Sequence, residues 1–339
     1  MINFCTLFDS YYLDKGIALY RSLEKVSNDF TIYIFCFDDR SFTILNEMNF
    51  KYAVILHHSC FETPELLEKK KERSKAEYCW TCTTVTIEYV LDYYSVDSCT
   101  YLDSDLYFYA SPQILFNEIN AVKADTTIVK HRFKDNAHGR KLEERNGKYC
   151  VEFNYFCQTL NSRKILRWWK DKCFEWCFDI PEPNRMGDQK YLNQFTNLFD
   201  GVHELQHLGG GVAPWNLEQY TLDSVEDASG VVLRTEDGQK FPIVFYHFQN
   251  IRYMPGRIVN IKSQTKSKRL KYAIYIPYLK EIESIRTMLT NSYGISYDSK
   301  GIVRSSNLFV GFLQKHFAAF KVQTLSDIIY LDKLNDYKY

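Results

Sequence analysis

What this chain of 339 residues lacks excludes several classes of protein. It carries no net charge, because 42 Lys and Arg balance 42 Asp and Glu, and this argues against a general nucleic-acid binder. It has no apolar segment at its N-terminus, so we expect neither a signal peptide nor a membrane span. Its ten cysteines lack the spacing of a disulfide framework, which favours the reducing cytoplasm. The sequence therefore points away from secreted, membrane-spanning and nucleic-acid-binding proteins.

Two pairs of cysteines are spaced closely enough to suggest zinc or redox chemistry. Two residues separate Cys79 from Cys82, and three separate Cys173 from Cys177. A structural zinc ion would need both pairs as ligands. Both pairs lie in aromatic, helix-forming stretches, where cysteine is more often a small buried apolar side chain. We interpret all four as structural, with zinc and redox roles as the alternatives.

Alternating strand and helix patterns predict an α/β fold. This order implies a mostly parallel sheet with helices on both faces. In such sheets ligands bind beyond the carboxyl ends of the strands, where Asp9, Asp38 and Asp39 fall. The expected strands are at residues 3–8, 30–37, 52–57, 100–108, 126–129, 151–160 and 244–248. The expected helices are at residues 13–26, 41–48, 64–75, 76–94, 112–117 and 162–178.

A candidate metal site lies in the strand expected at residues 100–108. Asp103 and Asp105 would point to the same side of an extended chain, about 7 Å apart. Two carboxylates repel each other and are costly to bury unless a cation lies between them. Oxygen ligands suit Mg²⁺ or Mn²⁺, which keep open positions for substrate phosphates. The sequence predicts such a cation here, and a solvated turn or helix cap is the alternative.

Five short motifs, taken in order, resemble a known family: residues 4–9, 101–105, 153–156, 187–189 and 246–248. The chain is similar to GT-A type glycosyltransferases that use nucleotide sugars. It resembles in particular the family 8 retaining enzymes and related transferases of bacterial polysaccharide and lipopolysaccharide synthesis. The resemblance covers about residues 1–255 and implies a GT-A catalytic domain there. Residues 256–339 would form a C-terminal helical extension rich in basic and aromatic residues.

The resemblance implies a nucleotide site at the first strand, where Thr6, Leu7, Phe8 and Asp9 would hold uracil and ribose. Asp9 could equally cap the following helix, and the two roles are compatible. Other nucleotide- or sugar-contacting groups implied by the resemblance are Arg73, Lys75, Ser104 and Gly210.

The resemblance also implies three catalytic-site residues. Asn154 matches the asparagine that contacts the donor sugar, and an amide inside an apolar strand is costly unless it is hydrogen-bonded. Asp188 and Gln189 match a pair that faces the donor sugar and the acceptor, with the glutamine amide oxygen against the reacting anomeric face. For Asp188, capping of a helix N-terminus is the alternative.

Two histidines compete for the third metal position. His207 begins a segment that resembles the family 8 signature His-x-x-Gly-x-x-Lys-Pro-Trp, although Ala213 replaces the lysine. His247 ends an apolar strand and follows the Asp-Gln motif at a distance, as the metal histidine of the family does. We assign the metal to His247 and a pocket-shaping role to His207. The missing lysine leaves the diphosphate-binding group open among Arg252, Arg257 and Lys262.

The segment at residues 257–278 is basic and aromatic. Basic residues with exposed aromatics suit anionic lipid headgroups or a lipid-diphosphate acceptor, and a solvated surface is the alternative. Helices are expected at residues 278–290 and 308–320. We expect a cytoplasmic protein, with peripheral binding to the inner face of the membrane as a further option.

Together these patterns predict a hexosyltransferase that uses Mn²⁺ or Mg²⁺. It would move a sugar from a nucleotide diphosphate, expected to be UDP, to a glycan or lipid-linked acceptor, with retention implied by the resemblance. One alternative is a nucleotidyltransferase acting on sugar phosphates, which normally carries a glycine-rich basic loop after its first strand. Residues 8–12 offer no such loop. The other alternative is a catalytically silent sugar-binding module.

Overall fold

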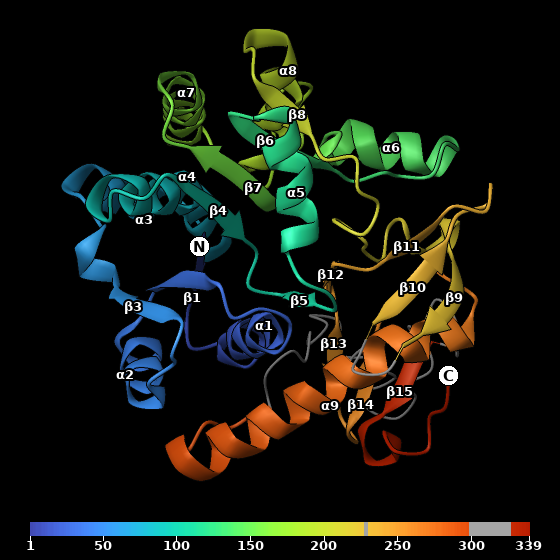
Figure 1. The fold of residues 1–339 in the computed structure, drawn as a ribbon. Helices are drawn as coiled ribbons and strands as arrows, with labels where there is room; N and C mark the ends of the chain where they lie inside the picture. The colour runs from blue at the N-terminus through green and yellow to red at the C-terminus, as the bar shows by residue number, and fades with distance from the viewer. Residues whose placement is uncertain (227–229, 298–326) are drawn as a thin grey trace.

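Seven strands form the central sheet of the computed structural model, which describes residues 1–226, 230–297 and 327–339 (Figure 1). The strand order is β3-β2-β1-β4-β7-β6-β8, and β7 runs antiparallel to both of its neighbours while the other paired strands are parallel. The predicted α/β class with a mostly parallel sheet is confirmed. The strands are β1 (Ile2–Phe8), β2 (Phe30–Cys36), β3 (Ala53–His57), β4 (Ser98–Leu102), β6 (Thr126–Lys130), β7 (Tyr149–Cys157) and β8 (Val202–Glu204).

Helices cover both faces of this sheet, so β1 is buried along its whole length. Because side chains alternate along a strand, Phe4 and Phe8 join one apolar core and Cys5 and Leu7 join another. Helix α1 packs into the first core, and α4 and α7 pack into the second. The helices are α1 (Leu13–Val26), α2 (Asp39–Met48), α3 (Pro64–Glu72), α4 (Lys75–Tyr93), α5 (Gln113–Val122), α6 (Ala137–Asn146), α7 (Leu160–Glu175), α8 (Phe195–Leu198) and α9 (Lys268–Tyr293).

Local sequence explains where the helices begin. Ser74 and Glu77 form a reciprocal capping box at the start of α4, and Asp38 caps α2 by accepting from the backbone of Ser41. The polar stretch at residues 135–146, which suits a mobile flap, forms helix α6. Helix α9 begins ten residues before the expected start at residue 278, with Pro277 inside it. The helix expected at residues 308–320 lies outside the described residues.

The chain beyond the central sheet adds short antiparallel strands. Strand β5 (Leu106–Phe108) pairs with β12 (Phe245–His247). Helix α9 packs along α1 and crosses the lower part of Figure 1. The described part of residues 256–339 contains two short strands as well as the expected helix, and a domain boundary at residue 255 stays a prediction. The remaining strands are β9 (Thr221–Val225), β10 (Val231–Arg234), β11 (Lys240–Pro242), β13 (Arg252–Met254), β14 (Ile258–Asn260) and β15 (Ile328–Tyr330).

The expected basic and aromatic surface at residues 257–278 is wrong for three of its members. The Tyr275 hydroxyl lies 2.7 Å from that of Tyr246, and the Tyr278 ring stacks on Phe248 with centroids 3.7 Å apart. Lys271 is buried and pairs with Asp327 at 2.7 Å. These side chains face the core because α9 turns one apolar face towards it. The basic residues of this segment that remain exposed on α9 and just before it are Lys266, Lys268 and Arg269.

The cysteines behave as apolar side chains. Cys82, Cys173 and Cys177 are buried, and burial raises the pKa of the Cys82 thiol well above its ordinary value. Within the described residues, no cluster of three or more potential metal ligands includes Cys79 or these three. In the same part of the chain, no helix is both long and apolar enough to cross a membrane.

Two ion pairs join α1 to α9 and differ in burial. Asp14 is 2% exposed and accepts from Arg286 Nε at 2.7 Å, whereas Arg21 and Glu281 form a half-exposed pair at 2.9 Å. Asp14→Ala should lower the free energy of unfolding by about 3 kcal/mol, because it leaves a buried guanidinium without its main partner. Glu281→Ala, the matched control, should cost below about 1 kcal/mol. Urea unfolding of both variants tests this, and equal losses would contradict it.

Candidate functional site

The acidic side chains expected at strand ends gather at one edge of the sheet. Strands β2, β1 and β4 are parallel neighbours, so their carboxyl ends lie side by side. Asp9 follows β1, Asp38 follows β2, and Asp103 follows β4. This is the edge at which open α/β sheets bind ligands.

The strand that carries the two aspartates is interrupted. Strand β4 ends at Leu102, and the carbonyl of Asp103 accepts from the backbone N–H of Leu106 at 3.2 Å, closing a turn that holds the buried Ser104. The expectation of one extended strand through both aspartates is therefore wrong. The turn brings their carboxylates together, and ligand atoms of Asp103, Asp105 and His247 all lie within 4.8 Å of one another.

Of the two competing histidines, His247 lies beside the aspartates. Its Nε2 is 3.1 Å from Asp105 Oδ1 and 3.7 Å from Asp103 Oδ2. The antiparallel pairing of β12 with β5 places it there, because His247 lies opposite Leu106 in the register. The backbone of His207 is instead held by Glu118 on α5 at 2.9 Å.

Glu152 is a member of this site that the sequence interpretation missed. Its Oε2 lies 2.8 Å from His247 Nδ1, and its side chain is fully buried. A carboxylate accepts, so Nδ1 carries a proton and Nε2 faces the aspartates. Histidines that bind metals commonly use such a carboxylate on the far side of the ring. Glu152 could have been recognised from the sequence as a charged residue inside the largely apolar stretch at residues 151–156.

The electrostatics of the cluster show a shortage of positive charge. Burial raises the pKa of Asp103 well above its ordinary value, and the charges of Asp105 and Asp188 raise it further. Burial also acts to raise the pKa of Asp105, but the charge and hydrogen bond of His247 hold it below its ordinary value. Burial lowers the pKa of His247, but the charge and hydrogen bond of Asp105, together with hydrogen bonds to Cys150 and Glu152, raise it well above its ordinary value. Two carboxylates and an imidazole that needs a proton to balance them fit a divalent cation.

Lys15 supplies a second cation next to the cluster. Its Nζ lies 3.9 Å from Asp105 Oδ2 and 4.1 Å from the centroid of the Tyr12 ring. Burial lowers the pKa of Lys15, but the charges of Asp105, Tyr12 and Asp14 together outweigh it, and the pKa ends above its ordinary value. The sequence interpretation missed Lys15. It could have been recognised from its position in the first turn of α1, the helix that follows the expected nucleotide-binding strand β1. Of the expected diphosphate-binding groups, Arg257 is paired instead with Asp332 and Glu283.

The residues expected to bind the nucleotide are partly brought together. Lys75 pairs with Asp9, whose Oδ1 also accepts from the backbone of Tyr11 at 2.8 Å. The Thr6 hydroxyl is buried without a partner among the described residues. Leu7 and Phe8 belong to the two apolar cores.

Arg73 lies buried between two helices instead. It donates to Thr81 of α4 and to the carbonyl of Phe174 at 2.9 Å. It therefore holds the start of α4 against the end of α7.

The three expected catalytic residues differ in their contacts. Neither amide atom of Asn154 has a hydrogen-bond partner within the described chain, although the residue is fully buried. Asp188 is buried with one carboxylate oxygen unpartnered in the same residues, and burial raises its pKa to about 7. Gln189 donates to the carbonyl of Asn146 at 2.8 Å, which ties the turn Gln189–Gln194 to the end of α6. Unpartnered buried polar atoms are costly, and Asn154 and Asp188 each carry at least one.

The glycine run after His207 lies against strand β12. The backbone of His247 donates to the carbonyl of Val212 at 2.9 Å. Gly211 has φ +91°, and a Cβ there would come within 2.8 Å of Glu152 Oε1. Gly211 thus lies against the site, whereas a Cβ on Gly210 would meet Leu115 and Leu205.

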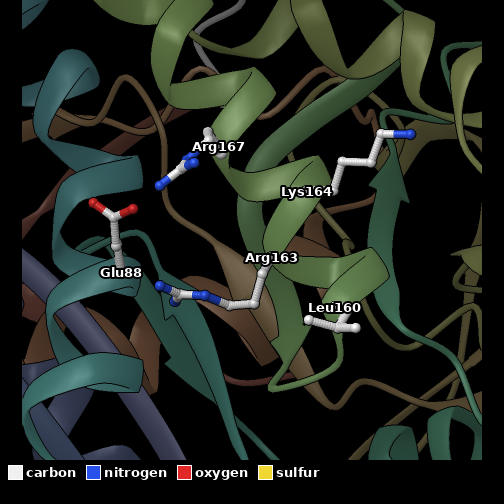
Figure 2. Close-up of a pocket in the computed structure, with 5 residues that line it drawn as sticks. All are labelled: Glu88, Leu160, Arg163, Lys164 and Arg167. Atoms are coloured by element: carbon white, nitrogen blue, oxygen red, sulfur yellow. The ribbon is translucent and has the colours of Figure 1, made fainter.

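A separate concave surface lies between α4 and α7 (Figure 2). It has a volume of about 350 Å³ and lies towards the end of β7, which is antiparallel and so ends at the opposite edge of the sheet from the aspartates. None of the expected site residues lines it. Its lining residues are Glu88, Leu160, Arg163, Lys164 and Arg167.

Fold and site define an α/β protein with a candidate divalent-cation centre at the carboxyl edge of its sheet. The chain belongs to the same family as the uncharacterized protein YfnF of Bacillus subtilis (strain 168), with 31% identity over 253 residues, which are 74% of this chain and 81% of YfnF. The uncharacterized protein YfnD of the same organism is 25% identical over 282 residues, covering 82% of this chain and 87% of YfnD. No protein-family model matches the chain.

Solved glycosyltransferases resemble parts of the structure. The galactosyltransferase LgtC, in complex with donor and acceptor sugar analogs, is 12% identical with a TM-score of 0.48 and covers 75% of this chain and 88% of LgtC. Mouse xyloside xylosyltransferase 1 is 11% identical with a TM-score of 0.43, covering 74% of this chain and 98% of that enzyme. GlyE of Streptococcus pneumoniae TIGR4 is 14% identical with a TM-score of 0.41, and the chain spans 46% of GlyE. Likenesses with TM-scores this low carry no argument about activity.

The raised pKa of Asp188 gives a prediction about stability. The carboxyl stays protonated in the folded state up to about pH 7 but ionises near pH 4 when unfolded. As the pH rises from about 4 to about 7, the free energy of unfolding of the wild type should therefore fall relative to that of Asp188→Asn, and the loss should reach about 4 kcal/mol at pH 8. Chemical unfolding of both proteins at pH 4 and pH 8, in chelator, measures the difference. A pH-independent difference would contradict the buried, unpaired carboxylate.

Proposed function

We propose that this protein is a GT-A type glycosyltransferase that transfers a sugar from a nucleotide-diphosphate donor in a metal-dependent reaction. The observation that carries the proposal is the cluster of Asp103, Asp105 and His247 at the carboxyl edge of the sheet. Asn154 and Asp188, buried with unpartnered polar atoms, support it. We further propose UDP-hexose as donor, retention of configuration and a family 8 relationship, all of which follow from the sequence resemblance.

In this proposal each group has a defined task. Asp103, Asp105 and His247 hold Mn²⁺ or Mg²⁺, and Glu152 fixes the His247 ring so that Nε2 stays directed at the ion. When bound, the ion neutralises charge on the departing diphosphate. Lys15 adds positive charge beside Asp105, in place of the lysine that Ala213 replaces. Thr6, Asp9 and Lys75 contact the nucleoside, while Asn154, Asp188 and Gln189 face the sugar.

Most of the rate acceleration would then come from positioning and electrostatic stabilisation. The acceptor in this proposal is a glycan or a lipid-linked glycan, and the reaction takes place in the cytoplasm. Burial of Lys271, Tyr275 and Tyr278 removes much of the basis for peripheral membrane binding. That binding would now depend on Lys266, Lys268 and Arg269.

A panel of nucleotide sugars with Mn²⁺ tests the proposal. We expect at least one UDP-sugar to be hydrolysed slowly, releasing UDP and free sugar, and the rate to fall on chelation. A nucleotidyltransferase would instead form or cleave the nucleotide diphosphate with a sugar phosphate. A silent sugar-binding module would bind without turnover.

Removing either aspartate should abolish that hydrolysis. Asp103→Asn and Asp105→Asn each weaken charge compensation of the ion, and we expect activity to fall at least about a hundredfold, since such effects reach several kcal/mol. Folding should persist, because Asp103→Asn relieves repulsion and in Asp105→Asn the imidazole of His247 keeps Glu152 as a partner. Asp135→Asn, at a 94% exposed aspartate on the surface, is the matched control. Wild-type activity in either site variant would overturn the metal assignment.

Glu152 should act on metal affinity through His247. Glu152→Gln should weaken Mn²⁺ binding about 10- to 100-fold, because the ring loses the carboxylate that fixes its tautomer. His247→Asn should weaken it at least as much, whereas His207→Asn should leave it unchanged. Calorimetric Mn²⁺ titration measures all three. A loss confined to His207→Asn would transfer the ligand role to that histidine.

A further inference from the structure

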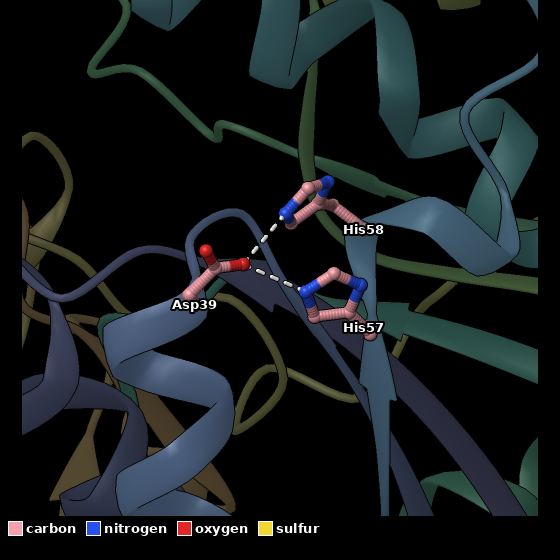
Figure 3. Close-up of side chains that lie close together, drawn as sticks. All are labelled: Asp39, His57 and His58. Carbon is pink, nitrogen blue, oxygen red and sulfur yellow. Dashed lines mark hydrogen bonds and ion pairs between the residues drawn. The ribbon is translucent and has the colours of Figure 1, made fainter.

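A second cluster of potential metal ligands lies at the outer edge of the sheet. Asp39 is the first residue of α2, His57 is the last residue of β3, and His58 opens the turn His58–Cys60. Strands β2 and β3 are parallel, with Cys36 opposite His57, so the segments that follow them are neighbours. Figure 3 shows both imidazoles directed at the same carboxylate. None of these residues belongs to the candidate site described above.

The two imidazoles converge on one point. His57 Nε2 lies 2.8 Å and His58 Nε2 3.1 Å from Asp39 Oδ1. Ligand atoms around a tetrahedral zinc ion, with bonds of about 2.0–2.1 Å, are about 3.4 Å apart. An outward shift of a few tenths of an ångström would therefore admit an ion between the three atoms. The Asp39 side chain is 86% exposed and free to make that shift.

The far side of each ring is anchored. His58 Nδ1 lies 3.1 Å from Glu62 Oε2, and the Glu62 side chain is only 6% exposed. Glu62 is itself held, since its Oε1 accepts from the Tyr78 hydroxyl at 2.8 Å and from Lys70 Nζ at 2.6 Å. His57 Nδ1 lies 2.7 Å from the Ser59 hydroxyl.

A hydrogen bond from Nδ1 to a fixed group, above all to a carboxylate, is the usual support of a metal-binding imidazole. His58 has such a carboxylate partner, whereas His57 Nδ1 accepts from the backbone N–H of Ser59 at 3.3 Å, so an ion at His57 Nε2 would have to displace a proton from that nitrogen. Both Nε2 atoms lie on the side of Asp39. A surface imidazole that only neutralised Asp39 would not need a second, buried carboxylate behind it.

We propose that Asp39, His57 and His58 form a binding site for a borderline divalent cation, namely Zn²⁺, with its fourth position open to solvent. Two nitrogens and one oxygen favour Zn²⁺ over Mg²⁺ or Mn²⁺, whereas the oxygen-rich cluster of Asp103, Asp105 and His247 favours the hard ions. The bound ion would clamp the end of β3 to the start of α2. This zinc site is independent of sugar transfer, and its proposal does not rest on the proposed function.

Zinc binding is tested with the full chain after removal of metals by a chelator. Two clusters that share His247 could also take Zn²⁺, namely Asp103 with Asp105 and Cys150 with Glu152, so the reference protein is Asp103→Asn/Asp105→Asn/His247→Asn. We expect it to bind one Zn²⁺ per chain in competition with a chromophoric chelator. Addition of His57→Asn/His58→Asn should lower that affinity at least a hundredfold. His138→Asn, at an exposed histidine on α6, is the matched control and should change nothing.

Asp39→Asn provides a variant that should fold even if the double histidine substitution does not, because Asp39 is exposed. It should weaken Zn²⁺ binding at least tenfold, and at equal Zn²⁺ concentration the melting temperature should rise less in this variant than in the reference protein. Co²⁺ supplies a second readout, through the visible absorption of a tetrahedral ion. Absence of Zn²⁺ binding in the reference protein, or binding untouched by both Asp39→Asn and the histidine variant, would overturn the proposal and leave only a hydrogen-bonded pair.

Discussion

Repulsion between Asp103 and Asp105 is the constraint around which the carboxyl edge of the sheet is arranged. Two carboxylates this close, with side chains only 29% and 14% exposed, are stabilised by positive charge beside them. Without an ion the chain provides a protonated His247 and the ammonium of Lys15, which are the groups a divalent cation would replace or assist. The pKa of Asp103 is nevertheless raised well above its ordinary value, first by burial and then by the negative charges of Asp105 and Asp188. A site that still needs positive charge has a driving force for binding a cation.

The backbone makes that arrangement possible by bringing distant segments together. The turn after β4 directs both carboxylates to one place, and the pairing of β12 with β5 delivers His247 to it. The glycine run then lies against β12, where the positive φ and missing Cβ of Gly211 let the backbone approach Glu152. Trp215 closes this layer, since its indole donates to the carbonyl of His131 and its ring lies 5.3 Å from that of His247.

Sequence alone predicted the parts of this structure that local pattern controls. The α/β order follows from strand and helix periods, and carboxylates at strand ends were visible as Asp103 and Asp105. Glu152 and Lys15 escaped because their role comes from contacts across the fold. Tyr275 and Tyr278 were misassigned because nearby basic residues suggested a surface, while the helical face that buries them depends on α1 and the β5–β12 pair. The role of Asn154 came from resemblance, and only the fold shows its amide buried and unpartnered.

The same edge of the sheet carries two clusters whose chemistry differs by one ligand. Beyond β4 two carboxylates meet one imidazole, and beyond β3 two imidazoles meet one carboxylate. Replacing one oxygen ligand of a site by a nitrogen ligand shifts the metal preference of the site from Mg²⁺ and Mn²⁺ towards Zn²⁺. Burial differs in the same sense, since His247 is 4% exposed while His57 and His58 are 27% and 28% exposed. The oxygen-rich cluster is open at Asp103, which is 29% exposed, and suits an ion that shares its coordination with a phosphate, whereas the nitrogen-rich cluster suits an ion that ties two surface segments together. Both clusters lie at this edge because β3 and β4 run parallel within the same sheet, so the residues that follow them lie at the same edge.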